Sequence, residues 1–158
     1  MAQLELDEIF FNALMEDAEL ALAVGGRIES TCFEVSPDEQ DNTQLPCIIV
    51  TDDGLTNNQQ TKDNVWESDG DRVQASVEVD GTSPKQVKQL IRMVRKAINN
   101  YITTLYTQGE DIPNLQSVQT SGVAWDWTKP CYHTTITYQC DVYNGIYDDE
   151  QDESNSDI

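Results

Sequence analysis

The stretch from Asp71 to Ile98 changes its hydrophobic spacing from every second residue to every third or fourth. Its first part puts small apolar side chains on one face and polar ones on the other: Val73, Ala75, Val77 and Val79. Such alternation is typical of a half-buried antiparallel strand. Gly81 interrupts the pattern, and Ser83 stands at a helix N-cap position directly before Pro84. The sequence therefore predicts a strand, a short turn and a capped helix.

The helix that begins at Pro84 is predicted to be long. Apolar residues recur at helical spacing along it: Val87, Leu90, Ile91, Val94, Ala97, Ile98, Tyr101, Ile102 and Leu105. With a rise of about 1.5 Å per residue, about 23 residues make a helix of roughly 35 Å, enough to cross a sheet. Its opposite face carries five of the nine basic residues of the chain: Lys85, Lys88, Arg92, Arg95 and Lys96. This basic face fits either an ordinary solvated helix surface or a contact between identical subunits.

The N-terminal half predicts one helix and several strands. Apolar residues from Leu6 to Val24 follow the spacing of an amphipathic helix, which the glycine pair at 25–26 ends. Residues 27–35 alternate as in a strand, and the apolar run after Pro46 predicts a strand of the core sheet. The polar segment from Asp53 to Asn64 predicts a long loop, which is either a plain hairpin tip or an arm that contacts a partner.

The remaining elements complete an α+β order. Asp69 and Gly70 suit a hairpin turn before the alternating strand, and residues 115–130 and 131–147 predict two strands after the long helix. Because helices and strands do not alternate regularly, a parallel sheet is not expected. The predicted fold is an α+β sandwich: a largely antiparallel sheet with an N-terminal helix and one long helix packed on one face.

The chain is strongly acidic, with 29 Asp and Glu against 9 Lys and Arg in 158 residues and a net charge of −20. Six of the acids fall in residues 148–158, which have almost no apolar side chain and predict a disordered tail. Residues 1–147 are predicted to form one domain, with a net charge of −14. A surface of this sign disfavours a groove that grips nucleic-acid phosphates.

Candidates for catalysis or cofactor binding are sparse. His133 is the only histidine and lies in a strand pattern, and the chain has no serine elbow and no phosphate-binding glycine loop. The cysteines are far apart in the sequence and predict buried free thiols: Cys32, Cys47, Cys131 and Cys140. No stretch has the length and apolarity of a membrane span, and no signal peptide is recognisable. We expect no enzyme activity, cofactor, metal or membrane contact, and synthesis in the cytoplasm.

Two metal sites stay open as alternatives to that expectation. Zinc would need the ligands Cys131, His133 and Cys140, although structural zinc sites generally use closely spaced pairs. Calcium would need a group of aspartates near the predicted hairpin, without the EF-hand pattern: Asp52, Asp53, Asp69 and Asp71. Buried thiols and solvated turn carboxylates are the simpler explanation of these residues.

The strand "RVQASVEV" and the helix "SPKQVKQLIRMVRKAI", with "LPCIIV" before them and a final pair of strands, resemble the tail-terminator and tail-completion proteins of long-tailed bacteriophages. The similarity is one of pattern and order over residues 5–143. It implies a non-enzymatic virion protein of the tail or neck. Such proteins form a ring, usually a hexamer, at the head-proximal end of the tail, between the tail tube protein and the head connector or head-closure protein. The acidic C-terminal segment and the connection 53–64 depart from the family pattern. They leave open which position along the phage tail or neck this protein would occupy.

The charge fits this resemblance, because an acidic lumen lets DNA pass through a ring without adhering to it. The basic residues Lys88, Arg92 and Arg95 would then lie near a subunit boundary. A competing hypothesis is an acidic DNA mimic of the anti-restriction type, which sequesters a DNA-binding protein. A host-encoded adaptor with another partner is a third.

Overall fold

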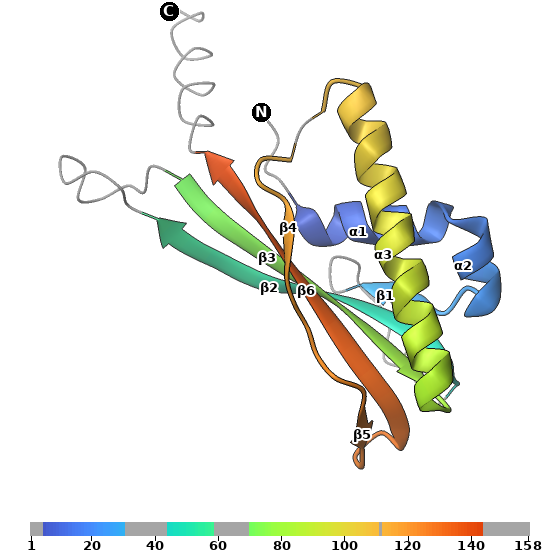
Figure 1. Ribbon diagram of the computed structural model, residues 1–158. Coiled ribbons are helices and arrows are strands. Elements are labelled where there is room, and N and C mark those ends of the chain that lie inside the picture. The colour runs from blue at the N-terminus through green and yellow to red at the C-terminus, as the bar shows by residue number, and fades with distance from the viewer. Residues whose placement is uncertain (1–4, 31–43, 59–69, 111, 144–158) are drawn as a thin grey trace, which may run out of the picture.

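The computed structural model describes residues 5–30, 44–58, 70–110 and 112–143 (Figure 1). Its elements are α1 (Leu6–Glu16), α2 (Ala18–Ala23), β1 (Ile28–Ser30), β2 (Cys47–Asn58), β3 (Gly70–Gly81), α3 (Pro84–Thr107), β4 (Gln116–Thr120), β5 (Ala124–Asp126) and β6 (Cys131–Tyr143). The strands form one sheet in the order β1-β2-β3-β6-β4, and β5 also pairs with β6. β1 is parallel to β2, and the other described pairings are antiparallel.

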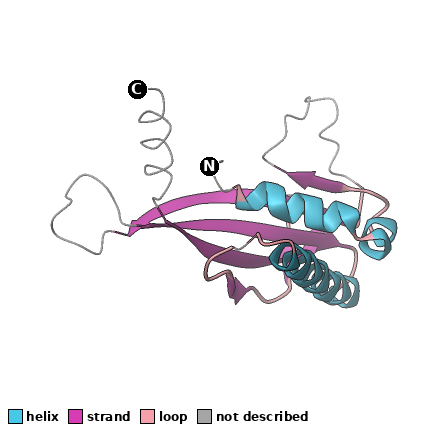
Figure 2. Ribbon diagram, turned by 90° about the horizontal axis from the view of Figure 1, so that it is seen from above, coloured by secondary structure: helices cyan, strands magenta, loops and turns pink. Residues whose placement is uncertain are grey.

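The helices cover one face of this sheet. Val77 of β3 lies opposite Ile136 of β6, and both side chains are fully buried. α1 and α3 contact each other and both pack on the sheet (Figure 1, Figure 2). Phe10 of α1 meets Tyr138 of β6 edge to face, with ring centroids 4.8 Å apart. The predicted α+β fold, with an N-terminal helix and a long helix on a largely antiparallel sheet, is confirmed.

The start of α3 follows the predicted capping pattern. The Ser83 side chain accepts a hydrogen bond from the backbone N–H of Gln86 at 3.2 Å, and the Gln86 side chain accepts one from the N–H of Thr82 at 2.8 Å. The first bond satisfies a backbone donor that the first helical turn leaves without a partner, and the second ties the Gln86 side chain to the residue before the N-cap. The helix runs for 24 residues and buries the apolar side of its surface against the sheet and α1.

The single helix predicted from Leu6 to Val24 is wrong in one respect, because it is interrupted at Asp17. This residue is extended, with φ −82° and ψ 103°, and its side chain accepts a hydrogen bond from the N–H of Leu20 at 2.9 Å. Aspartate competes for the backbone in this way and starts a new helix. Leu20 and Val24 are nevertheless buried, so the apolar spacing identified the core residues correctly.

The long loop predicted from Asp53 to Asn64 is also wrong in part, since β2 continues to Asn58. The β2 backbone pairs with β3 as far as Asn58 opposite Gly70, with a register shift between Asp52 and Gly54. Main-chain hydrogen bonds to a neighbouring strand do not require apolar side chains. The polar end of β2 therefore has no hydrophobic pattern from which a strand could be predicted. After α3, the segment predicted as one strand contains two short ones, β4 and β5.

Several predictions fall on residues that the structure does not describe. These are the second half of the strand 27–35, Asp69, Cys32 and the acidic segment 148–158. The division into one domain and a tail therefore stays a prediction. The predicted hairpin turn at Asp69 and Gly70 is wrong at Gly70, which begins β3 and pairs with Asn58. Within the described ranges, no helix combines the length and apolarity needed to cross a membrane.

Candidate functional site

The basic face of α3 is exposed along its whole length. It consists of Lys85, Lys88, Arg92, Arg95 and Lys96, each of which is solvent-exposed. None of the five forms a salt bridge with another described residue. Their spacing of three and four residues places them on one side of the helix, opposite the buried side chains. A row of cations that has no ion-pair partner among the described residues is available to an acidic neighbour.

The basic residues line two separate surface pockets. Lys85, Lys88 and Arg92 line an open hollow of ≈ 650 Å³ beside the first turns of α3. Arg95 lines a separate pocket of ≈ 460 Å³ between α3 and β4, which we call the Arg95 pocket. Lys96 lines neither of them. The structure thus brings together three of the predicted residues and assigns Arg95 to a different environment.

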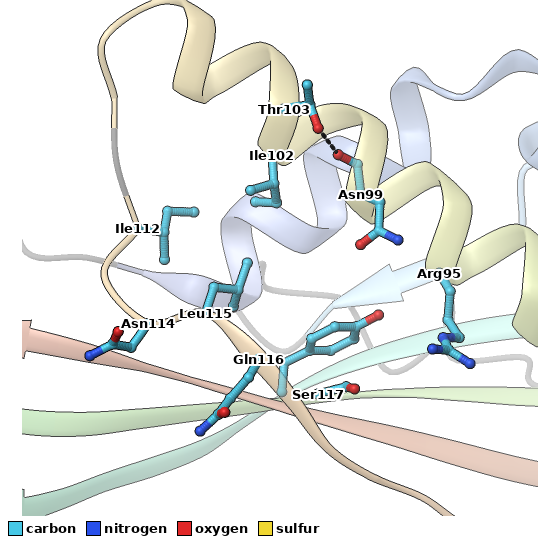
Figure 3. Close-up of a pocket in the computed structure, with 10 residues that line it drawn as sticks. Arg95, Asn99, Ile102, Thr103, Ile112, Asn114, Leu115, Gln116 and Ser117 are labelled. Carbon is cyan, nitrogen blue, oxygen red and sulfur yellow. Dashed lines mark hydrogen bonds between the residues drawn. The ribbon is translucent and has the colours of Figure 1, made fainter.

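The Arg95 pocket has a mixed lining, in which Ile102, Ile112, Leu115 and Tyr138 lie among polar side chains (Figure 3). Figure 3 shows Asn99 and Ile102 on α3 facing the segment that carries Leu115. Tyr138 of β6 also lines the pocket. Burial raises the pKa of Tyr138 to about 12, and the positive charge of Arg95 opposes this increase. The pocket can therefore take an apolar group next to a cation.

Acidic side chains lie along α1, on the other side of α3. The pKa of Glu5 is raised by a hydrogen bond to Glu8 and by the charge of Glu8. The pKa of Tyr101, on the α3 side that faces away from the basic residues, is raised by burial and by the charge of Glu16. Glu8 and Glu16 of α1 thus lie on the side of α3 away from its basic face. Such an arrangement suits head-to-tail association of identical subunits.

A buried ion pair that the sequence did not reveal lies on the sheet face away from the helices. Lys129 donates a hydrogen bond to Asp80 Oδ2 at 2.7 Å, and the Asp80 side chain is 1% exposed. The Cys47 thiol also donates to Asp80 Oδ2, at 3.7 Å, and Asp80 Oδ1 has no partner in the described structure. Burial alone would lower the pKa of Lys129, but the hydrogen bond to Asp80 and nearby negative charge raise it to about 12.

Glu78 extends this polar cluster toward solvent. Burial, followed by the charge of Asp80 and a hydrogen bond to it, raises the pKa of Glu78 to about 7. His133 Nδ1 lies 3.9 Å from Glu78 Oε1. The cluster lies at the end of β3 next to the turn before β6, and Lys129 joins that turn to the sheet. It has no nucleophile with a lowered pKa, because burial raises the pKa of Cys47, and that of Cys131 to about 11.

The turn between β5 and β6 displays two tryptophans. We call residues 124–130 the tryptophan turn. The Trp127 side chain is 87% exposed and that of Trp125 is 38% exposed. Their rings meet edge to face with centroids 5.8 Å apart, and Trp125 packs in the same manner on Tyr132 at 4.9 Å. The motif "WDW" was visible in the sequence, but only the structure shows that the second tryptophan points outward.

The residues considered for metal binding do not converge. Cys131 and His133 lie on the sheet face away from the helices, whereas Cys140 is buried in the core on the helix side. The predicted burial of free thiols is confirmed for Cys47, Cys131 and Cys140. Of the four aspartates, Asp52 accepts a hydrogen bond from the N–H of Gly54, and Asp69 is not described. Among the described residues, no group of three ligands suits a metal ion.

Comparison with known proteins gives a relationship of fold only. No protein-family model matches the sequence, and no curated protein matches it. Among solved structures, the chain is similar to a chain of "Virion of native gene transfer agent (GTA) particle". The two share 10% sequence identity and a TM-score of 0.55, and the match covers 87% of this chain and 94% of the other. Nearly the whole architecture is therefore one that also occurs in a virus-like particle.

Proposed function

We propose that this protein is a non-enzymatic structural subunit of a phage or phage-like virion. The observation that carries the proposal is the likeness of fold, which spans 87% of this chain and almost all of a chain from a gene transfer agent particle. A partial match could reflect a common strand and helix pair. A match over 87% of the chain extends well beyond such a pair. The sequence resemblance to tail-terminator proteins points in the same direction.

The finer role that we infer is a homo-oligomeric ring, of hexamer type, at the head-proximal end of the tail. There it would join the tail tube protein to the head connector or head-closure protein. The exposed basic face of α3 supports the ring, since five exposed cations on an acidic chain suit an acidic surface of the next subunit. The remaining negative charge suits a lumen through which DNA slides without adhering.

The DNA-mimic hypothesis finds less support in the described surface. A phosphate mimic needs rows of carboxylates over the area that meets the DNA-binding protein. Here a face of five cations runs along the longest helix instead. A mixing experiment separates the two: a mimic forms complexes with DNA-binding proteins that weaken steeply with salt, and a ring subunit forms none.

The ring is tested by measuring the molar mass of the protein by light scattering at low and high salt, with and without tail tubes. Because the proposed contact is between opposite charges, Arg92→Glu should weaken assembly by about tenfold or more. Arg72→Glu is the control, since Arg72 lies on the sheet away from α3 and its reversal changes the net charge equally. It also breaks the ion pair of Arg72 with Asp141, so circular dichroism must verify that this variant is folded. A strict monomer under every condition, or equal effects of the two reversals, would contradict the proposal.

A further inference from the structure

The tryptophan turn has the properties of a docking element. A side chain as large and apolar as Trp127 is rarely left 87% exposed, and exposed aromatic groups mark interaction sites. Tryptophan is also among the residues that dominate the energy of protein interfaces. The ring of Trp125 supports it from one side. The turn therefore presents a projecting aromatic group whose ring contact within the described part of the chain is with Trp125.

The turn is held rigidly. Asp126 Oδ1 accepts hydrogen bonds from the N–H groups of Thr128 at 2.9 Å and Lys129 at 3.3 Å. The Lys129 ammonium is tied to the buried carboxylate of Asp80, and Trp125 packs on Tyr132 of β6. A group that is ordered before binding loses little conformational entropy when it docks. These contacts distinguish the turn from a floppy loop tip.

The Arg95 pocket has the matching properties. Its volume of ≈ 460 Å³ lies within the range of about 300–1,000 Å³ that is typical of ligand pockets, so an indole fits. Ile102, Leu115 and Tyr138 offer it apolar and aromatic surface, and Asn99 offers an acceptor for the indole N–H. Arg95 at the rim can lie against the face of an indole ring, a favourable cation–π geometry.

The two features lie at different places on the molecule. The tryptophan turn lies at one end of the sheet, at β5, and the pocket lies beside the second half of α3, next to Tyr138 in the middle of β6 (Figure 1). A projection and a pocket on separate surfaces of one chain create a head-to-tail contact between copies, which closes into a ring when the rotation permits. Charge favours this contact as well, because Asp126 adjoins the projecting Trp127 and Arg95 lines the pocket.

We propose that Trp127 of one subunit inserts into the Arg95 pocket of the next copy of this chain. This contact rests on the proposed ring and specifies its geometry. Asp126 approaches the basic face of the neighbour, and Trp127 fills the space between α3 and β4. The occupant is thus a second copy, and each subunit both gives a tryptophan and receives one.

The first test is Trp127→Ala, with Leu22→Ala as the control, because Leu22 is 83% exposed on α2 and lies outside the turn and the pocket. Loss of a tryptophan at the centre of an interface should raise the protein concentration for half-assembly about thirtyfold. Leu22→Ala should leave this concentration unchanged. Circular dichroism verifies that both variants are folded. Assembly of Trp127→Ala equal to that of the wild type overturns the contact and leaves the ring intact.

The second test is crosslinking between subunits. Thr128 lies next to Trp127, and Asn99 lines the pocket. One version of the chain carries Thr128→Cys, and a second version, distinguishable by its mass, carries Asn99→Cys. When the two chains are co-expressed and oxidised, a disulfide-linked heterodimer should form, and each chain alone should give only the background of oxidised wild type. No heterodimer in an assembled ring, or a disulfide to the tail tube protein instead, overturns the proposal. If the wild type never assembles, the ring itself fails.

Discussion

Replacing Lys129 by methionine tests the buried ion pair beneath the tryptophan turn. Methionine keeps the length and apolar stem of the side chain but removes its charge. The Asp80 carboxylate, 1% exposed, then keeps only the Cys47 thiol and the neighbouring Glu78 carboxyl group as hydrogen-bonding partners among the described residues, and neither carries a positive charge. Since Asp80 Oδ1 already has no partner, the variant leaves a buried charge almost uncompensated. The result should be a large loss of stability from a residue near the surface.

The size of this loss follows from the burial of the two partners. Breaking a buried ion pair from one side costs about 3–5 kcal/mol. Lys129 is 24% exposed, so water reaches the site more easily than in a closed core. We therefore expect the lower end, about 3 kcal/mol, which for a chain of this length lowers the melting temperature by about 6–12 °C.

Urea unfolding followed by circular dichroism measures this quantity directly. The double variant Asp80→Asn/Lys129→Met removes both charges and should recover at least half of the loss, because no unpaired ion stays buried. A Lys129→Met protein within 0.5 kcal/mol of the wild type would refute the reasoning. So would a double variant that is no more stable than Lys129→Met, since the loss would then come from packing and not from charge.

Three further outcomes follow from single residues. Gly81→Ala should lower the free energy of unfolding by about 1–3 kcal/mol, because the added Cβ would lie 2.8 Å from a methyl group of the fully buried Val87. Thermal or urea unfolding measures this change, and a variant as stable as the wild type contradicts the prediction. Ser83→Ala should cost about 1 kcal/mol by removing the cap of α3, and Ser83→Asp should retain stability. The pKa of Glu78 is raised from 4.5 to about 7, so the folded state binds its proton more tightly, and the unfolding free energy should fall as pH rises through this window. Glu78→Gln should remove that contribution, and parallel pH profiles of the two proteins would count against it.

Local signals in the sequence were sufficient for the elements that depend on neighbours along the chain. The alternation from Val73 to Val79 predicted which face of β3 is buried. Ser83 and Pro84 predicted the start of α3, because a cap and a fixed φ angle act within one turn of the helix. The basic face also followed from spacing alone, and its exposure is confirmed.

The predicted boundaries of helices and strands were wrong where a distant or competing contact determined the backbone conformation. Asp17 caps α2 with its own side chain, so apolar spacing that was continuous did not give one continuous helix. The polar end of β2 is a strand because β3 supplies the main-chain partners, and no side-chain pattern records that pairing. β5 is similarly defined by its pairing with β6.

The sequence by itself determined the α+β class, the acidic character and the residues that face the core, since hydrophobic burial depends on periodicity and charge depends on composition. Only the tertiary structure decided the sites. Asp80 and Lys129 are 49 positions apart and meet because β3 and the turn before β6 lie side by side. Trp127 and the Arg95 pocket became recognisable for the same reason: exposure and concavity are properties of packed surfaces, and a chain acquires them only when it folds.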